Sequence, residues 1–432
     1  LAPTERRRAP DTVALALERA IAHLGGQLSK AYLLYSTPPT GLWLALHDLY
    51  RVAQWLRLED KAVEDPELGG TDVSPRWSYL HALLLAISNP YRLAQKDIHE
   101  AWLVTRSWAR MAQLRSGSAG EHAYAIPLDE DRGPGYLPEE RSSEAGAVLY
   151  FDTNPLEREL ERQLSLVGGV QGPISFRLKN AAAVSVEPQL IRRIMQSWTP
   201  LASRNHVRLP AGHLLDTLVG LHAIHYFLAG ELDFENFVRR ACGPAVHLSD
   251  RDRAAAWTAQ GLEFTRPEVY RAKVIDQSLG GYRIEWDRAD AVRARVGEIV
   301  AVAQADEEEG GDRDWMIGMI RWLRIAPEGR VDAGIELLAR QARAAVLRTL
   351  DVEVVVVGGG CDLGVGHAHA DFHRVFMALA VPIAGGLDDH ADGDVGRHGH
   401  RDREQEAPPE QPPELVGVVM VAVVLVVVIV IV

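Results

Sequence analysis

Apolar positions recur at helical spacing near the start of the chain. In DTVALALERAIAHLGGQL, which begins at Asp11, they fall three and four residues apart and predict an amphipathic helix. Asp11 is the type of residue expected at an N-cap, and the pair Gly25 and Gly26 is typical of a break. The first helix is therefore expected between these two signals.

Three further segments with the same spacing follow. TGLWLALHDLYRVAQWLRL has Thr40 as its expected cap, RWSYLHALLLAISNP ends at Pro90, and DIHEAWLVTRSWARMAQL has Asp97 at its start. Short loops between such helices predict antiparallel pairs, stacked as in an α-solenoid, over residues 10–115. The aromatic residues of this region are expected to pack between helices. They are Trp43, Tyr50, Trp55, Trp77, Tyr79, Trp102 and Trp108.

Residues 116–200 mix strand and helix patterns. AYAIPL and AVLYFDT are short strand candidates, with an acidic loop containing glycine and proline between them. LERELERQLSL and EPQLIRRIMQSWTPL have the spacing of amphipathic helices. We expect a mixed linker and helical region here.

The pattern changes again over residues 201–350. Short runs rich in β-branched and aromatic residues alternate with turn signals; they are HLLDTLVGLHAIHYFL, EVYRAKVI, YRIEW, RVGEIVAV, WMIGMIRWLRI and DAGIELLA. Such runs predict a small antiparallel β-barrel, and ARQARAAVLR after the last of them predicts a closing helix. The predicted fold class is therefore α+β and multidomain, with a helical region ahead of a barrel.

The composition shifts abruptly at residue 351. Valine, glycine, histidine and aspartate dominate without periodicity, as a GC-rich gene translated out of frame would produce. We interpret residues 351–432 as a low-complexity, frameshifted tail. HAHADFH and HGHRD contain residue types that bind metals, but we assign no metal site to them. Residues 415–432 carry no charge and would form a membrane tail anchor if they are translated.

The charge balance excludes one class of partner. A net charge of −13 and a pI near 5.7 argue against a DNA- or RNA-binding protein, which needs a basic face. Cys242 and Cys361 form neither a disulfide framework nor a zinc-ligand spacing, and the segment LAPTERRRAPDTV has no apolar signal-peptide core. We expect a cytoplasmic protein.

One short stretch, KVIDQSLGGYRIEW, contains the pattern D-x-S-x-x-G at Asp276, Ser278 and Gly281. The Asp276 carboxylate can accept hydrogen bonds from a nucleobase edge, and the Ser278 hydroxyl can donate or accept. Gly280 and Gly281 allow a sharp turn and a close approach of the chain to a ligand. The same residues also make a good hairpin turn. By itself, the pattern leaves both interpretations open.

A second pattern, R-x-x-x-R, precedes the first barrel-like run. Arg204 and Arg208 in RNHVRLP lie on one side of the chain if the segment is helical or turned. Each guanidinium can hold a phosphate, pair with O6 and N7 of guanine, or stack on a purine. The alternative is a solvated basic stretch.

Together the two patterns resemble those of the PilZ domain, a family of bacterial receptors for cyclic di-GMP. Members carry R-x-x-x-R on the segment that enters a six-stranded barrel and D/N-x-S-x-x-G on a barrel strand and turn. DWMIGMIRWLRI and GIELLA resemble the last barrel strands of the family. The resemblance covers residues 201–350 and implies a PilZ-like, six-stranded antiparallel barrel with an insertion. The whole chain is similar to larger proteobacterial proteins with helical regions ahead of an atypical PilZ-like domain.

The resemblance implies a function in signalling. Cyclic di-GMP would bind at the barrel, where the two arginines hold phosphate and guanine, Asp276 and Ser278 read guanine edges, and Gly281 allows close approach. No catalysis and no cofactor follow. Ligand binding would reorient the helical region, which would contact an unidentified protein partner.

One departure from the family concerns distance along the chain. Asp276 lies 68 residues after Arg208 in the sequence, a longer separation than is usual in the family. The intervening segment predicts an insertion with helical content. Arginines in it can assist in binding the ligand; they are Arg239, Arg240, Arg251 and Arg253. Its histidines, His222, His225 and His247, are interpreted as structural.

Two other function classes remain as alternatives. An enzyme finds little support, because VVVVGGGCDLGVG has G-x-G only at Gly364 and Gly366 and no amphipathic helix follows it. The stronger alternative is a non-enzymatic helical scaffold with a degenerate barrel that binds no nucleotide. In a receptor, Arg204, Arg208, Asp276 and Ser278 would converge around one pocket, and a scaffold has no need of this.

Overall fold

The computed structural model describes twelve stretches of the chain, and the statements below concern these. They are residues 3–65, 70–116, 123–136, 148–166, 172–177, 183–198, 207–243, 266–288, 294–305, 313–349, 354–358 and 424–431. The chain forms two compact units. The first comprises Leu1–Ile224, Arg266–Ala342 and Ile431–Val432, and the second His225–Thr265 and Arg343–Val430. The domain boundaries expected from the sequence stay a prediction.

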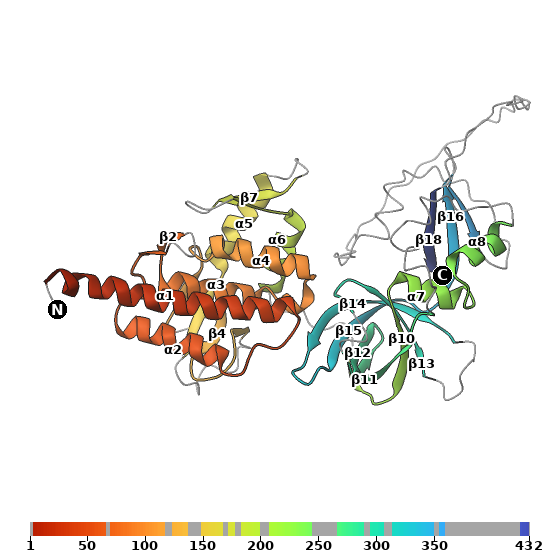
Figure 1. Ribbon diagram of the computed structural model, residues 1–432, viewed down its shortest axis with the longest axis horizontal. Coiled ribbons are helices and arrows are strands. Elements are labelled where there is room, and N and C mark those ends of the chain that lie inside the picture. The colour runs from red at the N-terminus through yellow and green to blue at the C-terminus, as the bar shows by residue number, and fades with distance from the viewer. Residues whose placement is uncertain are drawn as a thin grey trace, which may run out of the picture. The chain divides into compact units, whose positions relative to one another are not determined.

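Four helices build the N-terminal region, as predicted. They are α1 (Pro3–Leu33), α2 (Leu42–Trp55), α3 (Pro75–Ile87) and α4 (Gln95–Trp108), drawn in red to orange in Figure 1. α1 contacts each of the other three. The helices therefore share one core, whereas in a solenoid each helix pair would contact only its neighbours.

The first helix departs from the prediction at both ends. α1 runs without interruption through Asp11 and through the glycine pair, so the expected N-cap and the expected break are both wrong. A Cβ on Gly25 would lie 3.4 Å from a ring carbon of Trp102 and 3.6 Å from the Cβ of Ala82. The glycine thus lets α3 and α4 approach α1 closely, and this packing outweighs the poor helix propensity of glycine.

The start of α2 is stabilised by a residue far away in the sequence. The expected cap at Thr40 is wrong, because Gly41 occupies the N-cap position and no side-chain cap from it forms. The carboxylate of Asp131 accepts instead from the N–H groups of Gly41 at 2.5 Å, Trp43 at 3.0 Å and Leu44 at 3.3 Å. A carboxylate at a helix N-terminus also interacts favourably with the helix dipole.

Most of the predicted aromatic residues pack between the helices. Trp43, Tyr50, Tyr79 and Trp108 are buried, and so is Trp77. Trp55 is the exception, since its side chain is 82% exposed at the end of α2. Helical spacing alone did not identify this outward position.

The region up to residue 198 adds short strands and two helices. The strands expected at AYAIPL and AVLYFDT form, and so do both amphipathic helices. The elements are β1 (Val63–Asp65), β2 (Gly70–Val73), the 3₁₀ helix η1 (Pro90–Arg92), β3 (Gln113–Arg115), β4 (Ala123–Pro127), β5 (Gly135–Tyr136), β6 (Val148–Asp152), α5 (Asn154–Leu166), β7 (Ile174–Arg177), β8 (Ala183–Val186) and α6 (Pro188–Trp198). Strands β3, β6, β4 and β5 make a four-stranded sheet in that order.

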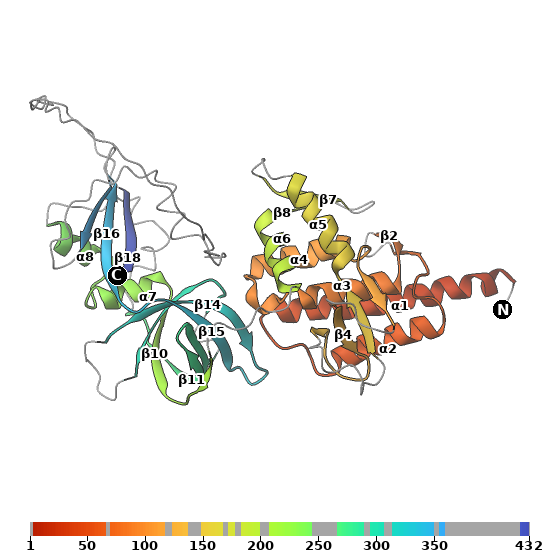
Figure 2. The same cartoon turned by 180° about the vertical axis from the view of Figure 1, so that it is seen from behind.

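Six antiparallel strands close into a barrel, as predicted. They are β10 (Leu214–Val219), β11 (Tyr270–Ser278), β12 (Gly281–Trp286), β13 (Ile299–Gln304), β14 (Met316–Ile325) and β15 (Val331–Ala339). Their order is β10-β13-β14-β15-β12-β11, and pairing of β10 with β11 closes the ring. Figure 2 shows the strands curving around the interior. The short strand β9 (Leu209–Pro210) pairs with β11.

The first run of the barrel region is not a single strand, contrary to the prediction. In HLLDTLVGLHAIHYFL, β10 ends at Val219, Gly220 follows with φ of 88°, and α7 (Leu221–Leu228) begins. The expected helical content of the insertion is present, since α8 (Phe234–Cys242) follows α7.

The predicted closing helix at ARQARAAVLR is wrong. The segment forms strand β16 (Ala342–Thr349), which pairs with β17 (Val354–Gly358). Ala344 belongs to an apolar cluster with Phe234, Phe237 and Val238. Alanine and arginine favour helices locally, but pairing with a valine-rich strand decides the conformation here.

Part of the expected tail anchor is described. Val424–Ile431 forms strand β18 beside β16. No helix among the described residues is long and apolar enough to span a membrane. The rest of the expected anchor and the histidine-rich segments lie outside the described residues.

Candidate functional site

A β-bulge turns Asp276 to the outside of the barrel. Val274 is buried and pairs with Ile284, and the register then shifts so that Asp276 pairs with Arg283. Side chains two positions apart on a regular strand share a face, so without the extra residue Asp276 would face the core. Asp276 and Arg283 instead face outward together.

Arg208 meets Asp276 at this outer face. Its Nη1 donates to Oδ1 of Asp276 at 2.7 Å, and the two side chains are 39% and 21% exposed. The backbone supports the contact, because Leu209 pairs with Gln277 and Pro210 with Asp276. The two patterns are thus in contact although Arg208 and Asp276 are 68 positions apart in the sequence. Arg204 lies outside the described residues.

Ser278 and Gly281 shape the turn that follows Asp276. The Ser278 hydroxyl donates to the carbonyl oxygen of Gly281 at 3.3 Å. Gly281 has φ of 156°, and a Cβ there would overlap the carbonyl oxygen of Ile335 in β15. This glycine is therefore required for the approach of β12 to β15, a packing role that the sequence did not reveal. Leu279, at the tip of the turn, is 73% exposed.

Residues from two more strands extend the same row. Asp276 pairs with Arg283, Arg283 with Gly334, and Gly334 with Trp322. A Cβ on Gly334 would overlap the indole of Trp322, so the ring lies directly over the glycine. Trp322 is partly exposed and offers an aromatic surface on the face that carries the two charged groups.

Sequence reasoning missed Arg283 and its partners. Arg283 donates from Nε and Nη2 to the two carboxylate oxygens of Asp332, at 3.0 and 2.8 Å. Arg324 also donates to Asp332, at 3.2 Å. The hydrogen bonds to Asp332 raise the pKa of Arg283, and the carboxylates of Asp276 and Glu285 act in the same direction. The alternation of buried and outward residues in YRIEW marks Arg283 as outward, but only the strand register identifies its neighbours.

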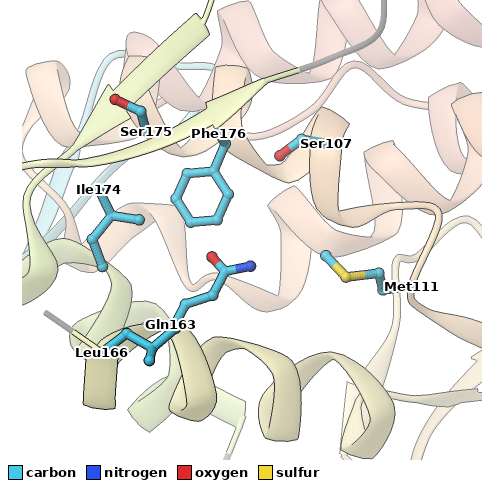
Figure 3. Close-up of a pocket in the computed structure, with 7 residues that line it drawn as sticks. All are labelled: Ser107, Met111, Gln163, Leu166, Ile174, Ser175 and Phe176. Carbon is cyan, nitrogen blue, oxygen red and sulfur yellow. The ribbon is translucent and has the colours of Figure 1, made fainter.

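A separate pocket lies away from these patterns. Its volume is about 420 Å³, and its lining comes from α4 and the segment after it, from α5 and from β7. Figure 3 shows the Phe176 ring and the Gln163 amide pointing into the space, with Met111 on another side. None of the lining residues is titratable, so they offer no group for acid–base chemistry. The lining residues are Ser107, Met111, Gln163, Leu166, Ile174, Ser175 and Phe176.

The other candidate groups have structural surroundings. His225 is buried, and its ring packs edge-on against Phe234 and Phe237. Arg239 pairs with Glu235 on α8. Within the described stretches, no three histidine, cysteine or acidic residues are grouped so as to hold a metal ion. Arg251, Arg253 and His247 lie outside these stretches.

Comparisons with known proteins agree with the helical region and the barrel. A model of the N-terminal domain of the cyclic-di-GMP receptor FimW matches residues 1–119, and a model of the middle PilZ domain of FimW matches residues 123–261 and 249–344. The cyclic-di-GMP receptor FimW of Pseudomonas aeruginosa is 26% identical over 389 residues. The match covers 81% of this chain and 63% of that relative. No solved structure matches the chain.

Proposed function

The chain belongs to the FimW family, whose middle domain is a PilZ domain, and from that premise we propose that it binds cyclic di-GMP on the outer face of its barrel. One observation carries the proposal: Nη1 of Arg208 lies 2.7 Å from Oδ1 of Asp276. A guanidinium suits a phosphate or the O6 and N7 atoms of guanine, and a carboxylate suits the donors of guanine. Both kinds of group are adjacent here.

Binding replaces the Arg208–Asp276 ion pair with contacts to the ligand. The pair is partly exposed, and exposed pairs contribute only about 0–1 kcal/mol, so opening it costs little. A ligand phosphate then takes Arg208, and a guanine edge takes Asp276 and Ser278. Arg204 supplies the second guanidinium of the pattern, and Gly281 lets the ligand approach the turn. No catalytic step and no cofactor are needed.

Calorimetric titration of the full chain with cyclic di-GMP tests the proposal. We expect the wild type to bind, and Arg208→Ala and Asp276→Ala each to weaken binding about 10-fold or more, since a hydrogen bond to a charged group contributes about 1.5–3 kcal/mol. Arg330→Ala is the matched control, because Arg330 pairs with Glu328 and Glu285 and does not belong to the row of Asp276, Arg283, Gly334 and Trp322. A folded wild-type chain that binds no cyclic di-GMP would leave the helical scaffold with a degenerate barrel.

The response to the ligand belongs to the helical region in this proposal. Within the first unit, the N–H of Ile325 at the end of β14 donates to the carbonyl of Tyr35 at 2.7 Å, and Thr37 donates back to Ile325 at 3.3 Å. β14 also carries Trp322, which belongs to the outer row of Asp276, Arg283, Gly334 and Trp322. We call this row the ligand face, and it shares strand β14 with the backbone contact. We expect cyclic di-GMP to change hydrogen exchange at Ile325 and Thr37 as the helical region reorients; unchanged exchange at both amides would contradict it. A protein partner for the helical region and a cytoplasmic location complete the proposal.

A further inference from the structure

Arg283 and Asp276 stand side by side on the ligand face. They are direct partners across β11 and β12, and both point outward. Side chains in this relation have Cβ atoms about 4.5–5.5 Å apart, so one flat molecule can touch both. The row therefore presents a hydrogen-bond acceptor, the carboxylate of Asp276, directly beside a donor, the guanidinium of Arg283.

Asp332 holds Arg283 in a defined orientation. Two hydrogen bonds from Nε and Nη2 fix the plane of the guanidinium, and Asp332 is almost fully buried. Nη1 donates to no acceptor in the part of the chain that the structure describes. Asp332 also accepts from Arg324, so two guanidiniums share a single carboxylate. Arg283 therefore keeps a donor group, its Nη1, for a ligand.

We propose that Asp276 and Arg283 read one guanine base between them, which makes Arg283 a determinant of base specificity. The inference rests on the proposed binding of cyclic di-GMP. Guanine offers N–H donors at N1 and N2 and, next to them, the acceptors O6 and N7. The carboxylate accepts from the donors, and the guanidinium donates to the acceptors. Adenine lacks the N2 amine and places a donor, its N6 amine, where guanine has O6, so it opposes Arg283.

A purely structural role for Arg283 makes a different prediction. If it only joins β12 to β15 through Asp332, its removal weakens the barrel and affects every ligand equally. If it contacts a phosphate, binding also falls equally for every cyclic dinucleotide. Only a contact from Arg283 to O6 makes its removal weaken the binding of guanine and hypoxanthine ligands and spare adenine, because all three bases have N7 but adenine has an amine in place of O6.

The test uses the full chain and three ligands, namely cyclic di-GMP, cyclic di-IMP, which lacks the N2 amine, and cyclic di-AMP. Affinities of the wild type, Arg283→Ala, Arg283→Lys and the control Arg330→Ala are measured by calorimetry, with displacement titration for the weakest ligand. We expect Arg283→Ala to weaken the binding of cyclic di-GMP and cyclic di-IMP by the same factor, about 10-fold or more, and not to weaken the binding of cyclic di-AMP. Arg283→Lys keeps the ion pair with Asp332 but not the fork, so it should recover only part of the loss.

The outcomes separate the two proposals. A wild type that binds cyclic di-GMP while Arg283→Ala binds it equally well overturns the role of Arg283 and leaves the proposed function standing. Equal losses for all three ligands likewise overturn base reading. A wild type that binds none of the ligands overturns the proposed function and this inference with it. If Arg283→Ala fails to fold, Arg283→Lys decides. A preference for guanine as strong as that of the wild type would show that only the charge at this position matters, and would overturn base reading by the guanidinium.

Discussion

Two arginine–carboxylate pairs in the molecule differ in their access to water. In the helical region, Arg19 donates to both oxygens of Asp65, at 3.1 and 2.9 Å, and Asp65 is fully buried. On the barrel, Arg208 makes one hydrogen bond to Asp276, which is 21% exposed. A buried carboxylate cannot lose its partner without a large desolvation cost, whereas an exposed one can exchange its partner for water or a ligand.

The surroundings of the buried pair reinforce this difference. Glu18 is also fully buried, and its Oε1 accepts from the Ser78 hydroxyl at 2.8 Å. Burial raises the pKa of Glu18 to about 7, and the charge of Asp65 acts in the same direction. Glu18 and Asp65 are thus structural residues of the helical region. Asp276 on the barrel is partly exposed instead, so a ligand can reach it.

The largest effect is expected from Arg19→Ala. It removes the two hydrogen bonds that Arg19 donates to the carboxylate of Asp65, which has no exposed surface, and breaking a buried pair costs about 3–5 kcal/mol. Urea unfolding followed by circular dichroism measures the loss. Arg51→Ala is the control, because Arg51 pairs with Asp48 and Asp129 at the surface, where the expected change is below about 1 kcal/mol. Equal losses in the two variants would contradict the comparison.

A pH-dependent effect is expected from Glu18→Gln. The pKa of Glu18 is about 7 in the folded chain against an ordinary value of 4.5, so folding favours the protonated form. The stability that this residue contributes is present below pH 4.5 and is lost as the pH rises through about 7. Glutamine stays neutral and should be more stable than wild type at pH 8, by up to about 3 kcal/mol. Unfolding of both chains at pH 4 and pH 8 measures this; a difference that does not grow with pH would refute it.

A smaller loss of stability is expected from Gly281→Ala in the D-x-S-x-x-G pattern. The added Cβ overlaps the backbone of Ile335 and forces β12 away from β15, which we expect to cost about 1–3 kcal/mol. Hydrogen exchange of the barrel amides reports it. Gly212→Ala is the control, since a Cβ there meets no atom within 4 Å. Unchanged exchange in Gly281→Ala would mean that the glycine serves the ligand alone.

The smallest effect on stability is expected from Arg208→Ala. Its single, partly exposed ion pair should contribute less than about 1 kcal/mol to unfolding. The same variant should show a large loss of cyclic di-GMP affinity. Arg208→Ala thus affects binding much more than stability, whereas the main effect of Arg19→Ala is on stability. A marked loss of stability would place Asp276 among the structural carboxylates.

Local patterns were sufficient for the N-terminal helices and most of the barrel strands. Periods of three to four residues predicted the N-terminal helices, and short β-branched runs predicted the barrel strands. The patterns R-x-x-x-R and D-x-S-x-x-G also marked the segments that meet at the outer face of the barrel. These features depend on residues within a few positions of one another, so the sequence alone contains them.

Contacts between distant segments decided the rest. The sequence could not indicate that Asp131 would cap α2, that Trp102 would pack on Gly25 within an unbroken α1, or that a strand would follow β15 where a helix was expected. At the site, the bulge before Asp276 turns the carboxylate outward, and the strand register brings Arg283 beside it. The sequence determined which residues were available for recognition. Only the pairing of strands determined which of them share a face, because register relates residues that no local pattern connects.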